Sequence, residues 1–213
     1  MLDGRTPSPT KPCRRSSTCI RGCRSANLCG SNPREIAIAA RQSYTNSSHL
    51  EYSELMNKRV YIAGPYGFTE SGTKYLEGEV LPILLQAGFH PLNPWVDGAA
   101  ILKPVVSRDD ASIEEVRSAC SQVGSRNAEM IRHSSAVMAL LDGLECDSGT
   151  CAEIGFAAAL GLPVVGLRTD SRSAGDVPEI PINLQVLYFL EVNGGTLAPT
   201  LAAAVEVLTR CLA

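Results

Sequence analysis

The chain has 213 residues, of which 45% are hydrophobic and 19% charged, and its net charge at pH 7 is −3. This length is enough to bury one sizeable core, and the lack of any apolar run of about 18 residues excludes a membrane-spanning helix. Residues 1–59 hold ten Lys or Arg and four Asp or Glu, whereas residues 60–213 hold nine and eighteen. The acidic main body argues against binding of nucleic acid.

Residues 1–57 predict a disordered or loosely attached basic extension, because they are rich in Ser, Arg, Pro, Asn and Gly. Within this extension the sequence predicts one element, a short helix from Pro33 to Ser43. The absence of a secretory h-region predicts a cytoplasmic protein, although an organellar transit peptide has a similar Arg- and Ser-rich composition. We expect no metal site, since the four cysteines here form no close C-x2-C pair: Cys13, Cys19, Cys23 and Cys29. Because the sequence shows no secretion signal, we expect reduced thiols.

Residues 58–213 predict one domain in which strands and helices alternate. The apolar runs predict strands at 60–63, 89–92, 136–141 and 163–167, and the periodic segments predict helices at 73–87, 112–134, 150–160, 182–190 and 197–212. Pro82 predicts a kink or a start in the first helix, Gly124 an interruption of the second, and residues 96–109 a loop or short helix. The alternation predicts an α/β fold with a doubly wound parallel sheet and helices on both faces.

The segment from Asp147 to Gly155 lies between a predicted strand and a predicted helix. It therefore places Asp147 and Glu153 at the carboxyl end of a strand, where open α/β sheets bind their ligands. We expect Glu153 in the first turn of the helix, where the helix dipole favours an ionised carboxylate. Two carboxyl groups in different environments are suited to cleaving a glycosidic bond. The structural alternative is a capping box, which Thr150-x-x-Glu153 also matches.

From about Val60 to the C-terminus the chain resembles the nucleoside 2-deoxyribosyltransferase family. The resemblance rests on the order and spacing of several short motifs: Tyr61-Ile-Ala-Gly-Pro65, Asn127 with Ile131, Asp147-Ser-Gly-Thr-x-x-Glu153-Ile-Gly155, Leu160-Gly-Leu-Pro-Val164, Arg168-Thr-Asp-Ser-Arg172 and Ile182-Asn183-Leu184. It implies a flavodoxin-like sheet and exchange of the base on a 2-deoxynucleoside through a covalent deoxyribosyl–Glu153 intermediate. It implies small nucleosides and free bases as partners, and neither a metal nor an organic cofactor.

Three further roles follow from the resemblance, each with a structural alternative. Asp147 would contact the base or the sugar hydroxyls, and it is our candidate for protonating the departing base; a loop or N-cap aspartate is the alternative. Asn127 stands where some members carry an Asp that handles the base; an amide can hydrogen-bond a base but cannot act as an acid, and a surface helix residue is the alternative. Asn183 would be donated by a neighbouring subunit, which predicts a homodimer or larger assembly, whereas an N-cap is the alternative.

Other residues are expected to bind substrate because they follow the first two strands or border the nucleophile. Tyr61 matches a family tyrosine beside the pocket, and glycines in the loop 64–68 permit close approach of the backbone. Gly64 and Gly149 are both expected to contact substrate. Tyr66 or Phe68 could stack on a base, with core or rim packing as the alternative. Trp95 and Asp97 would face the same edge.

Two other functions stay open from the sequence alone. A hydrolase would use the same Glu153 and pass the sugar to water, and one related group acts on 2-deoxynucleoside 5′-monophosphates. Ser71 and Gly72 could belong to a phosphate cradle, but no Arg lies within residues 60–80, which disfavours a monophosphate. The other alternative is a nucleoside-binding module without turnover.

Overall fold

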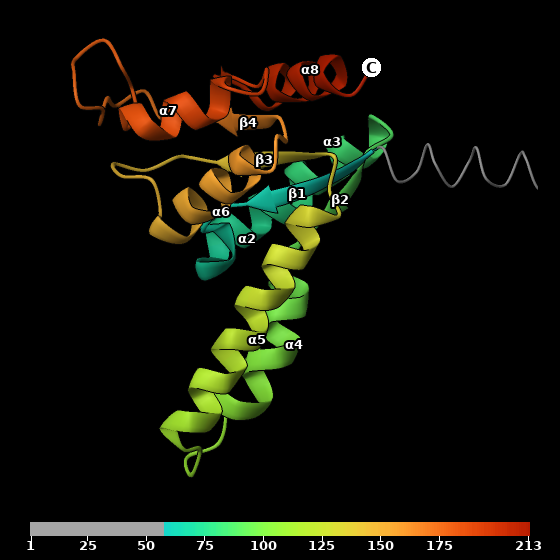
Figure 1. Cartoon of the computed structure of the whole chain (residues 1–213), viewed down its shortest axis with the longest axis vertical. Helices are drawn as coiled ribbons and strands as arrows, with labels where there is room; N and C mark the ends of the chain where they lie inside the picture. The colour runs from blue at the N-terminus through green and yellow to red at the C-terminus, as the bar shows by residue number, and fades with distance from the viewer. Residues whose placement is uncertain (1–57) are drawn as a thin grey trace, which may run out of the picture. The chain divides into compact units, whose positions relative to one another are not determined.

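The computed structural model of the chain describes residues 58–213 (Figure 1). The basic extension, its four cysteines and the helix predicted at 33–43 lie outside the described residues. The described part is built on a five-stranded parallel sheet in the order β2-β1-β3-β4-β5. This is the order of a flavodoxin-like doubly wound sheet, so the predicted fold class is confirmed. The strands are β1 Arg59–Ala63, β2 His90–Leu92, β3 Ala136–Leu140, β4 Val164–Leu167 and β5 Leu197–Ala198.

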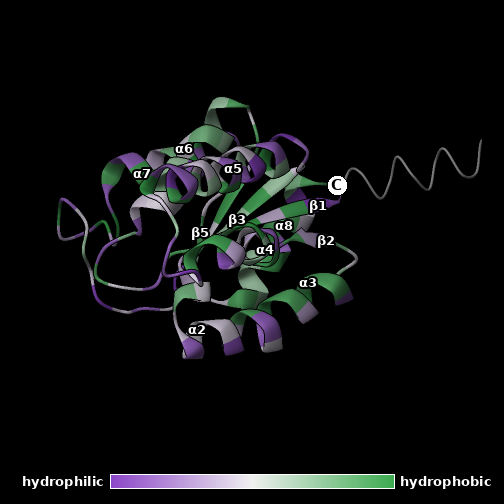
Figure 2. Cartoon of the chain, turned by 90° about the horizontal axis from the view of Figure 1, so that it is seen from below, coloured by the Kyte–Doolittle hydropathy of each residue, from purple (hydrophilic) through white to green (hydrophobic). Residues whose placement is uncertain are grey.

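Successive side chains of the central strands point to opposite faces of the sheet, so the core consists of two layers, one on each face. In β1, Val60 and Ile62 pack on one face of the sheet, whereas Tyr61 and Ala63 pack on the other, as the period of two in a strand requires. The first face is covered by α2, α3 and α8, and the second by α5, α6 and α7, so helices cover both faces (Figure 2). Tyr61 is therefore directed toward α5, α6 and α7.

The first helical segment begins earlier than predicted and contains an irregular turn. Residues 66–68 form a short 3-10 helix, α2 spans Glu70–Tyr75, a π-helical stretch spans Leu76–Val80, and α3 spans Leu81–Gln86. The wide turn directly precedes α3, in whose first turn lies Pro82, which has no N–H to donate to an α-helical ladder. The predicted effect of Pro82 is confirmed as a start of regular helix.

The segment after β2 is a full helix, α4, spanning Pro94–Val106, where the sequence predicted a loop or short helix at 96–109. Its start is set by Asn93, whose side chain accepts a hydrogen bond from the Trp95 N–H, and by Pro94 in the first turn. An Asn followed by Pro is a helix-start signal, and it would have placed this helix correctly.

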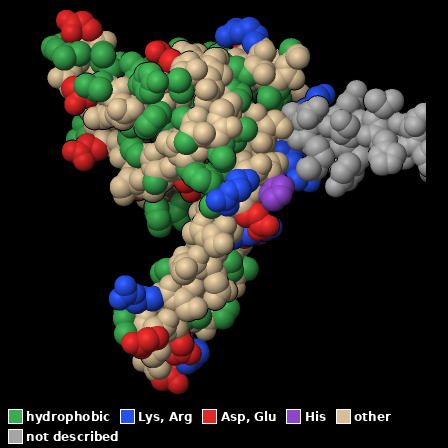
Figure 3. Space-filling model, viewed as in Figure 1, with side chains coloured by type: hydrophobic (Ala, Val, Ile, Leu, Met, Phe, Trp, Pro, Cys, Tyr) green, Lys and Arg blue, Asp and Glu red, His purple; other side chains and the backbone are tan. Residues whose placement is uncertain are grey.

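Helices α4 and α5 run side by side and extend away from the sheet (Figure 1). The helix α5 spans Ile113–Arg132 without a break, so the predicted interruption at Gly124 is wrong. A single exposed glycine costs only about 1 kcal/mol in a helix, which packing against α4 offsets. The predicted capping box at Ser112 and Glu115 is present. Charged side chains gather at the far end of the pair (Figure 3), where Arg108 bridges Asp110 and Glu115.

The last three elements are α6 Ser148–Ala159, α7 Leu184–Glu191 and α8 Leu201–Cys211. The final helix begins four residues later than predicted, at Leu201 with Thr200 as its N-cap, because residues 197–198 form the edge strand β5 beside Gly166 and Leu167. Two residues are too few to show a strand pattern, so pairing with β4 decides their conformation. Within residues 58–213, no helix combines the length and apolar character needed to cross a bilayer.

Candidate functional site

Glu153 of α6 meets Tyr61 of β1 at the carboxyl edge of the sheet. The Tyr61 hydroxyl donates a 2.6 Å hydrogen bond to Oε1 of Glu153, and the tyrosine side chain is fully buried. The sequence predicted Glu153 in the first turn of the helix. This is wrong: because α6 begins at Ser148, Glu153 lies in its second turn. The influence of the helix dipole falls off within the first turn, so side-chain donors stabilise this carboxylate instead.

The second donor to Glu153 is Asn127 of α5, whose Nδ2 lies 3.3 Å from the same Oε1 atom. Burial raises the pKa of the Glu153 carboxyl above its ordinary value; the hydrogen bonds from Tyr61 and Asn127 oppose that shift, and the negative charge of Asp147 adds to it. The other end of the Asn127 amide, Oδ1, is buried and accepts no hydrogen bond from the described residues. An unpaired buried acceptor is costly, which sets Asn127 apart from an ordinary surface residue.

Asp147 is the N-cap of α6. Its Oδ2 accepts hydrogen bonds from the backbone N–H of Thr150 at 2.8 Å and from the Thr150 hydroxyl at 3.0 Å. The capping-box interpretation of Thr150 and Glu153 is therefore wrong: the cap lies three residues earlier, and Glu153 is directed to Tyr61 and Asn127. The N-cap alternative for Asp147 is present, and its expected contact with substrate stays a prediction.

A cavity of about 370 Å³, which we call the Glu153 cavity, opens beside these groups. This volume lies in the range of small-molecule sites. The cavity joins the loop after β1, the helices α4 and α5, and the start of α6, and it is lined by Gly64, Phe68, Pro94, Trp95, Gly98, Ala99, Leu102, Val123, Asn127, Asp147, Gly149, Thr150 and Glu153. Of the ten residues expected at the site, Gly64, Phe68, Asn127, Asp147, Gly149 and Glu153 are among them, and Tyr61 contacts Glu153 from behind.

Two aromatic rings form one wall of the Glu153 cavity. Phe68 packs edge-on against Trp95 with ring centroids 4.5 Å apart, although its side chain is 74% exposed. This packing depends on Gly67, where a Cβ atom would stand 2.0 Å from the Trp95 ring. At Gly64 a Cβ would lie 2.8 Å from Cβ of Leu140, so only glycine lets the loop pass this close to β3. Gly67 was not singled out among the expected site residues, although glycines in this loop were expected to permit close approach of the backbone; its place directly before Phe68 was the available signal.

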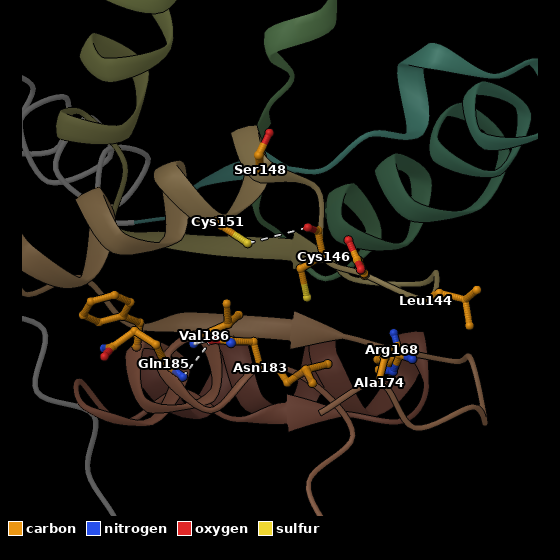
Figure 4. A pocket seen from close by; sticks show the side chains of 12 residues that line it. Leu144, Cys146, Ser148, Cys151, Arg168, Ala174, Asn183, Gln185 and Val186 are labelled. Atoms are coloured by element: carbon orange, nitrogen blue, oxygen red, sulfur yellow. Dashed lines mark hydrogen bonds between the residues drawn. The ribbon is translucent and has the colours of Figure 1, made fainter. Parts of the chain in front are cut away.

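Three expected residues lie outside this cavity. The Tyr66 hydroxyl donates to Asp142, and Asp97 pairs with Arg126 through a 2.7 Å bond. Asn183 caps α7 by accepting from the backbone N–H groups of Gln185 and Val186, and it lines a different cavity of about 560 Å³ between α6 and α7 (Figure 4). The N-cap alternative for Asn183 is thus present in the single chain.

Asp142, which sequence reasoning missed, connects three loops at the ligand edge of the sheet. Its Oδ1 accepts from the backbone N–H groups of Thr169 and Asp170 at 2.5 and 2.8 Å, and its Oδ2 accepts from the hydroxyls of Thr169 and Tyr66. Burial disfavours the charged form, but these hydrogen bonds outweigh it and hold the pKa of Asp142 below its ordinary value. Asp142 lies just after β3, and this position could have identified it from the sequence.

Arg168 ties the loop after β4 to the loop after β3. Its side chain is 6% exposed, and its guanidinium donates to the backbone carbonyls of Leu141, Gly143 and Arg172. Arg172 in turn pairs with Asp170. These contacts give both arginines a structural role in holding the loops. Within residues 58–213 no group of three or more His, Cys, Asp or Glu side chains is arranged to hold a metal ion.

Comparisons with known proteins bear on the same fold and site. Residues 60–185 match the family model described as nucleoside 2-deoxyribosyltransferase. The structure resembles a conserved protein from Enterococcus faecalis V583, with a TM-score of 0.56 and 25% identity over 72% of this chain and 98% of that one. It also resembles a 2-deoxyribosyltransferase from Leishmania mexicana, with a TM-score of 0.50 and 24% identity over 71% of this chain and 97% of that one. No curated protein matches the chain. The match over more than half of the sequence, on a sheet of the expected order, shows that the chain belongs to the nucleoside 2-deoxyribosyltransferase family.

Proposed function

We propose that this protein is a nucleoside 2-deoxyribosyltransferase, which exchanges the base of a 2-deoxynucleoside through a covalent deoxyribosyl intermediate on Glu153. The observation that carries the proposal is the placement of the Glu153 carboxylate at the wall of the cavity, with Tyr61 and Asn127 both donating to Oε1. Two donors on one oxygen fix the carboxylate and leave Oε2 as the oxygen that we assign to attack on the anomeric carbon.

The lining of the cavity supports a nucleoside as the substrate. The aromatic and aliphatic wall of Phe68, Trp95 and Leu102 suits the flat face of a base, and the polar groups at the start of α6 suit the sugar hydroxyls. Among the described residues that line the cavity, none is Lys or Arg. A phosphate would therefore find no cation there, and we assign a nucleoside and not its 5′-monophosphate as the donor.

We also propose that the active unit is a homodimer or a larger assembly in which Asn183 completes the site of a neighbouring copy. Asn183 is exposed at the start of α7, and it does not line the Glu153 cavity of its own chain. The same helix presents Leu184, Tyr188 and Val192, spaced four residues apart and each about half exposed. Hydrophobic side chains are prominent at the surface over α7 (Figure 3), and such a stripe is suited to contact between subunits.

The test is a chromatographic assay with deoxyinosine and deoxycytidine as donors, each with and without free adenine. Deoxyadenosine that forms only when adenine is present would support transfer. Free hypoxanthine or cytosine without a new nucleoside would assign a hydrolase that passes the sugar to water. Tight nucleoside binding without any release of base, by the wild-type protein and by Glu153→Ala alike, would assign a binding module and overturn the proposal.

A further inference from the structure

Departure of a base from a nucleoside is easier when an acid protonates it, and the Glu153 cavity is poor in acids. Among the described residues that line it, Asp147 and Glu153 are the two with titratable side chains. Glu153 has to be ionised in order to attack. Asp147 is engaged through Oδ2 by both the N–H and the hydroxyl of Thr150, so it serves as an acceptor at the cap of α6.

Other acids near the site are directed elsewhere. The Tyr61 hydroxyl is fully buried and donates to Glu153, and burial together with the charge of that carboxylate raises its pKa. The two histidines among the described residues, His90 and His133, line a separate polar cavity with Arg59 and Asp97. Neither one contributes to the wall of the Glu153 cavity.

The helix α5 contributes Asn127 to the lining of the cavity, one turn beyond Val123. Its amide donates to Glu153 and can donate a second hydrogen bond, but it holds no proton that it could transfer at neutral pH. A base in the cavity therefore meets a hydrogen-bond donor and apolar walls where a general acid would be required.

We propose that this enzyme releases the base without protonation by a side chain, and that Asn127 thereby selects nucleosides whose bases leave readily as anions. This inference rests on the proposed function. In the step, an electron pair on Glu153 Oε2 forms the bond to the anomeric carbon, the bond from that carbon to the base nitrogen breaks, and its electron pair stays on the nitrogen. The base anion then takes a proton from water, or from the incoming base that replaces it on the sugar.

The consequence is a steep dependence of rate on the acidity of the free base. A series of 2′-deoxyuridines with hydrogen, methyl, fluoro or nitro at position 5 changes that acidity while keeping the rest of the substrate constant. The nitro group is larger than methyl but gives the most acidic base, so the series separates acidity from size. We expect single-turnover release of the base to be about tenfold or more faster for the 5-fluoro than for the 5-methyl compound, and faster again for the 5-nitro compound.

Asn127→Asp tests the assignment to this residue. The introduced carboxyl would stand beside Glu153, and two neighbouring carboxyl groups share a proton that can be given to the base. We expect the difference between the 5-fluoro and 5-methyl compounds to shrink to about two- or threefold. Gln122→Glu, on the same helix but outside the Glu153 cavity, makes the same change from amide to acid and should keep the wild-type dependence.

The proposed function, the unprotonated release of the base and the role of Asn127 are contradicted by different results. A wild-type enzyme that releases all four bases at the same rate overturns the inference and leaves the proposed function standing. A dependence that Asn127→Asp leaves unchanged overturns the role of Asn127. No release from any member, nor from deoxyinosine or deoxycytidine, with the protein folded, overturns the proposed function and this inference with it.

Discussion

Tyr61 and Glu153 are 92 positions apart in the chain, and a 2.6 Å hydrogen bond joins them across the sheet edge. The tyrosine reaches the carboxylate because alternation along β1 directs it to the face that α6 covers. The bond connects the first strand to the helix that carries the proposed nucleophile, and it opposes the rise in the pKa of Glu153 that burial causes. It is the contact at which fold and proposed chemistry are most directly coupled.

Tyr61→Phe removes this donor and keeps the ring in the core. A hydrogen bond to a charged group contributes about 1.5–3 kcal/mol, so we expect kcat to fall by roughly 10- to 100-fold. The carboxylate must be ionised to attack, and loss of the bond raises its pKa further, so the acid limb of the pH profile of kcat should move to higher pH. Tyr75→Phe, which makes the same change at a partly buried tyrosine outside the Glu153 cavity, is the control. An acid limb that stays in place would contradict this role for Tyr61.

Glu153→Gln should abolish turnover and yet stabilise the fold at neutral pH. Because the folded-state pKa of Glu153 is raised, the stability that this carboxyl contributes is fully present below its unfolded pKa and is lost as the pH rises through the folded pKa. Glutamine does not ionise and keeps an acceptor for Tyr61. We expect a higher Tm than wild type at pH 7 and a shrinking difference toward about pH 4.

Thermal unfolding across that pH range checks the expectation for Glu153→Gln. Glu206→Gln, on the exposed side of α8, should change Tm little at either pH. A lower Tm than wild type at pH 7 would mean that the buried charge is compensated more fully than the contacts with Tyr61 and Asn127 indicate.

Asp142→Asn should loosen the loops at the ligand edge. An amide offers one acceptor oxygen where the carboxylate uses two, and its NH2 group would face donors such as the Tyr66 hydroxyl. We expect a loss of about 2 kcal/mol in the free energy of unfolding, measured with urea, and a rise in KM larger than the fall in kcat. Since the pKa of Asp142 is lowered in the fold, the difference from wild type should diminish as the pH falls through that pKa.

The control for this loss is Asp110→Asn, which removes an exposed carboxylate from an ion pair with Arg108 at the far end of the α4–α5 pair. Exposed pairs contribute less than about 1 kcal/mol, so stability should hardly change. Equal losses for the two variants would show that the network around Asp142 is no stronger than a surface ion pair.

The fold could be predicted largely from the sequence because most elements carry their own signal. The alternation of apolar runs with periodic segments predicts the four longer strands, and Ser112 with Glu115 predicts the start of α5. The sequence also contains the signal for the start of α4, Asn93 followed by Pro94, but this signal was not recognised. The strand β5 could not be predicted locally, since two residues adopt it only because the edge of β4 is free to pair with them.

Site residues that belong to the short motifs could be predicted from the sequence, whereas contacts between loops distant in the chain could not. Glu153, Asp147 and Asn127 were expected together, and the structure places all three on one cavity. The turn of α6 on which Glu153 lies was mistaken, because the cap is Asp147 and not Thr150. The four hydrogen bonds of Asp142 come from residues up to 76 positions away, a relation that one sequence without relatives does not reveal.

Gly67→Ala should damage substrate binding without unfolding the protein. Its Cβ would stand 2.0 Å from the Trp95 ring, so the ring has to move and the wall that it forms with Phe68 is lost. We expect KM for the nucleoside to rise about tenfold, which corresponds to about 1.4 kcal/mol of binding free energy. Gly124→Ala is the control: it meets no atom within 4 Å, and it should stabilise α5 by up to about 1 kcal/mol. Unchanged KM in Gly67→Ala would exclude this wall from binding.

The proposed donation of Asn183 across a subunit interface can be tested by mixing two inactive variants. Glu153→Ala lacks the nucleophile, and Asn183→Ala lacks the donated side chain together with the cap of α7. If each site combines Glu153 of one copy with Asn183 of its partner, a mixed dimer contains one intact site. Random pairing then restores about a quarter of wild-type activity. If both residues act within one chain, a mixed dimer gains no intact site and activity stays at the level of the separate variants. Asn183→Asp keeps the cap, so its activity separates loss of the cap from loss of the amide.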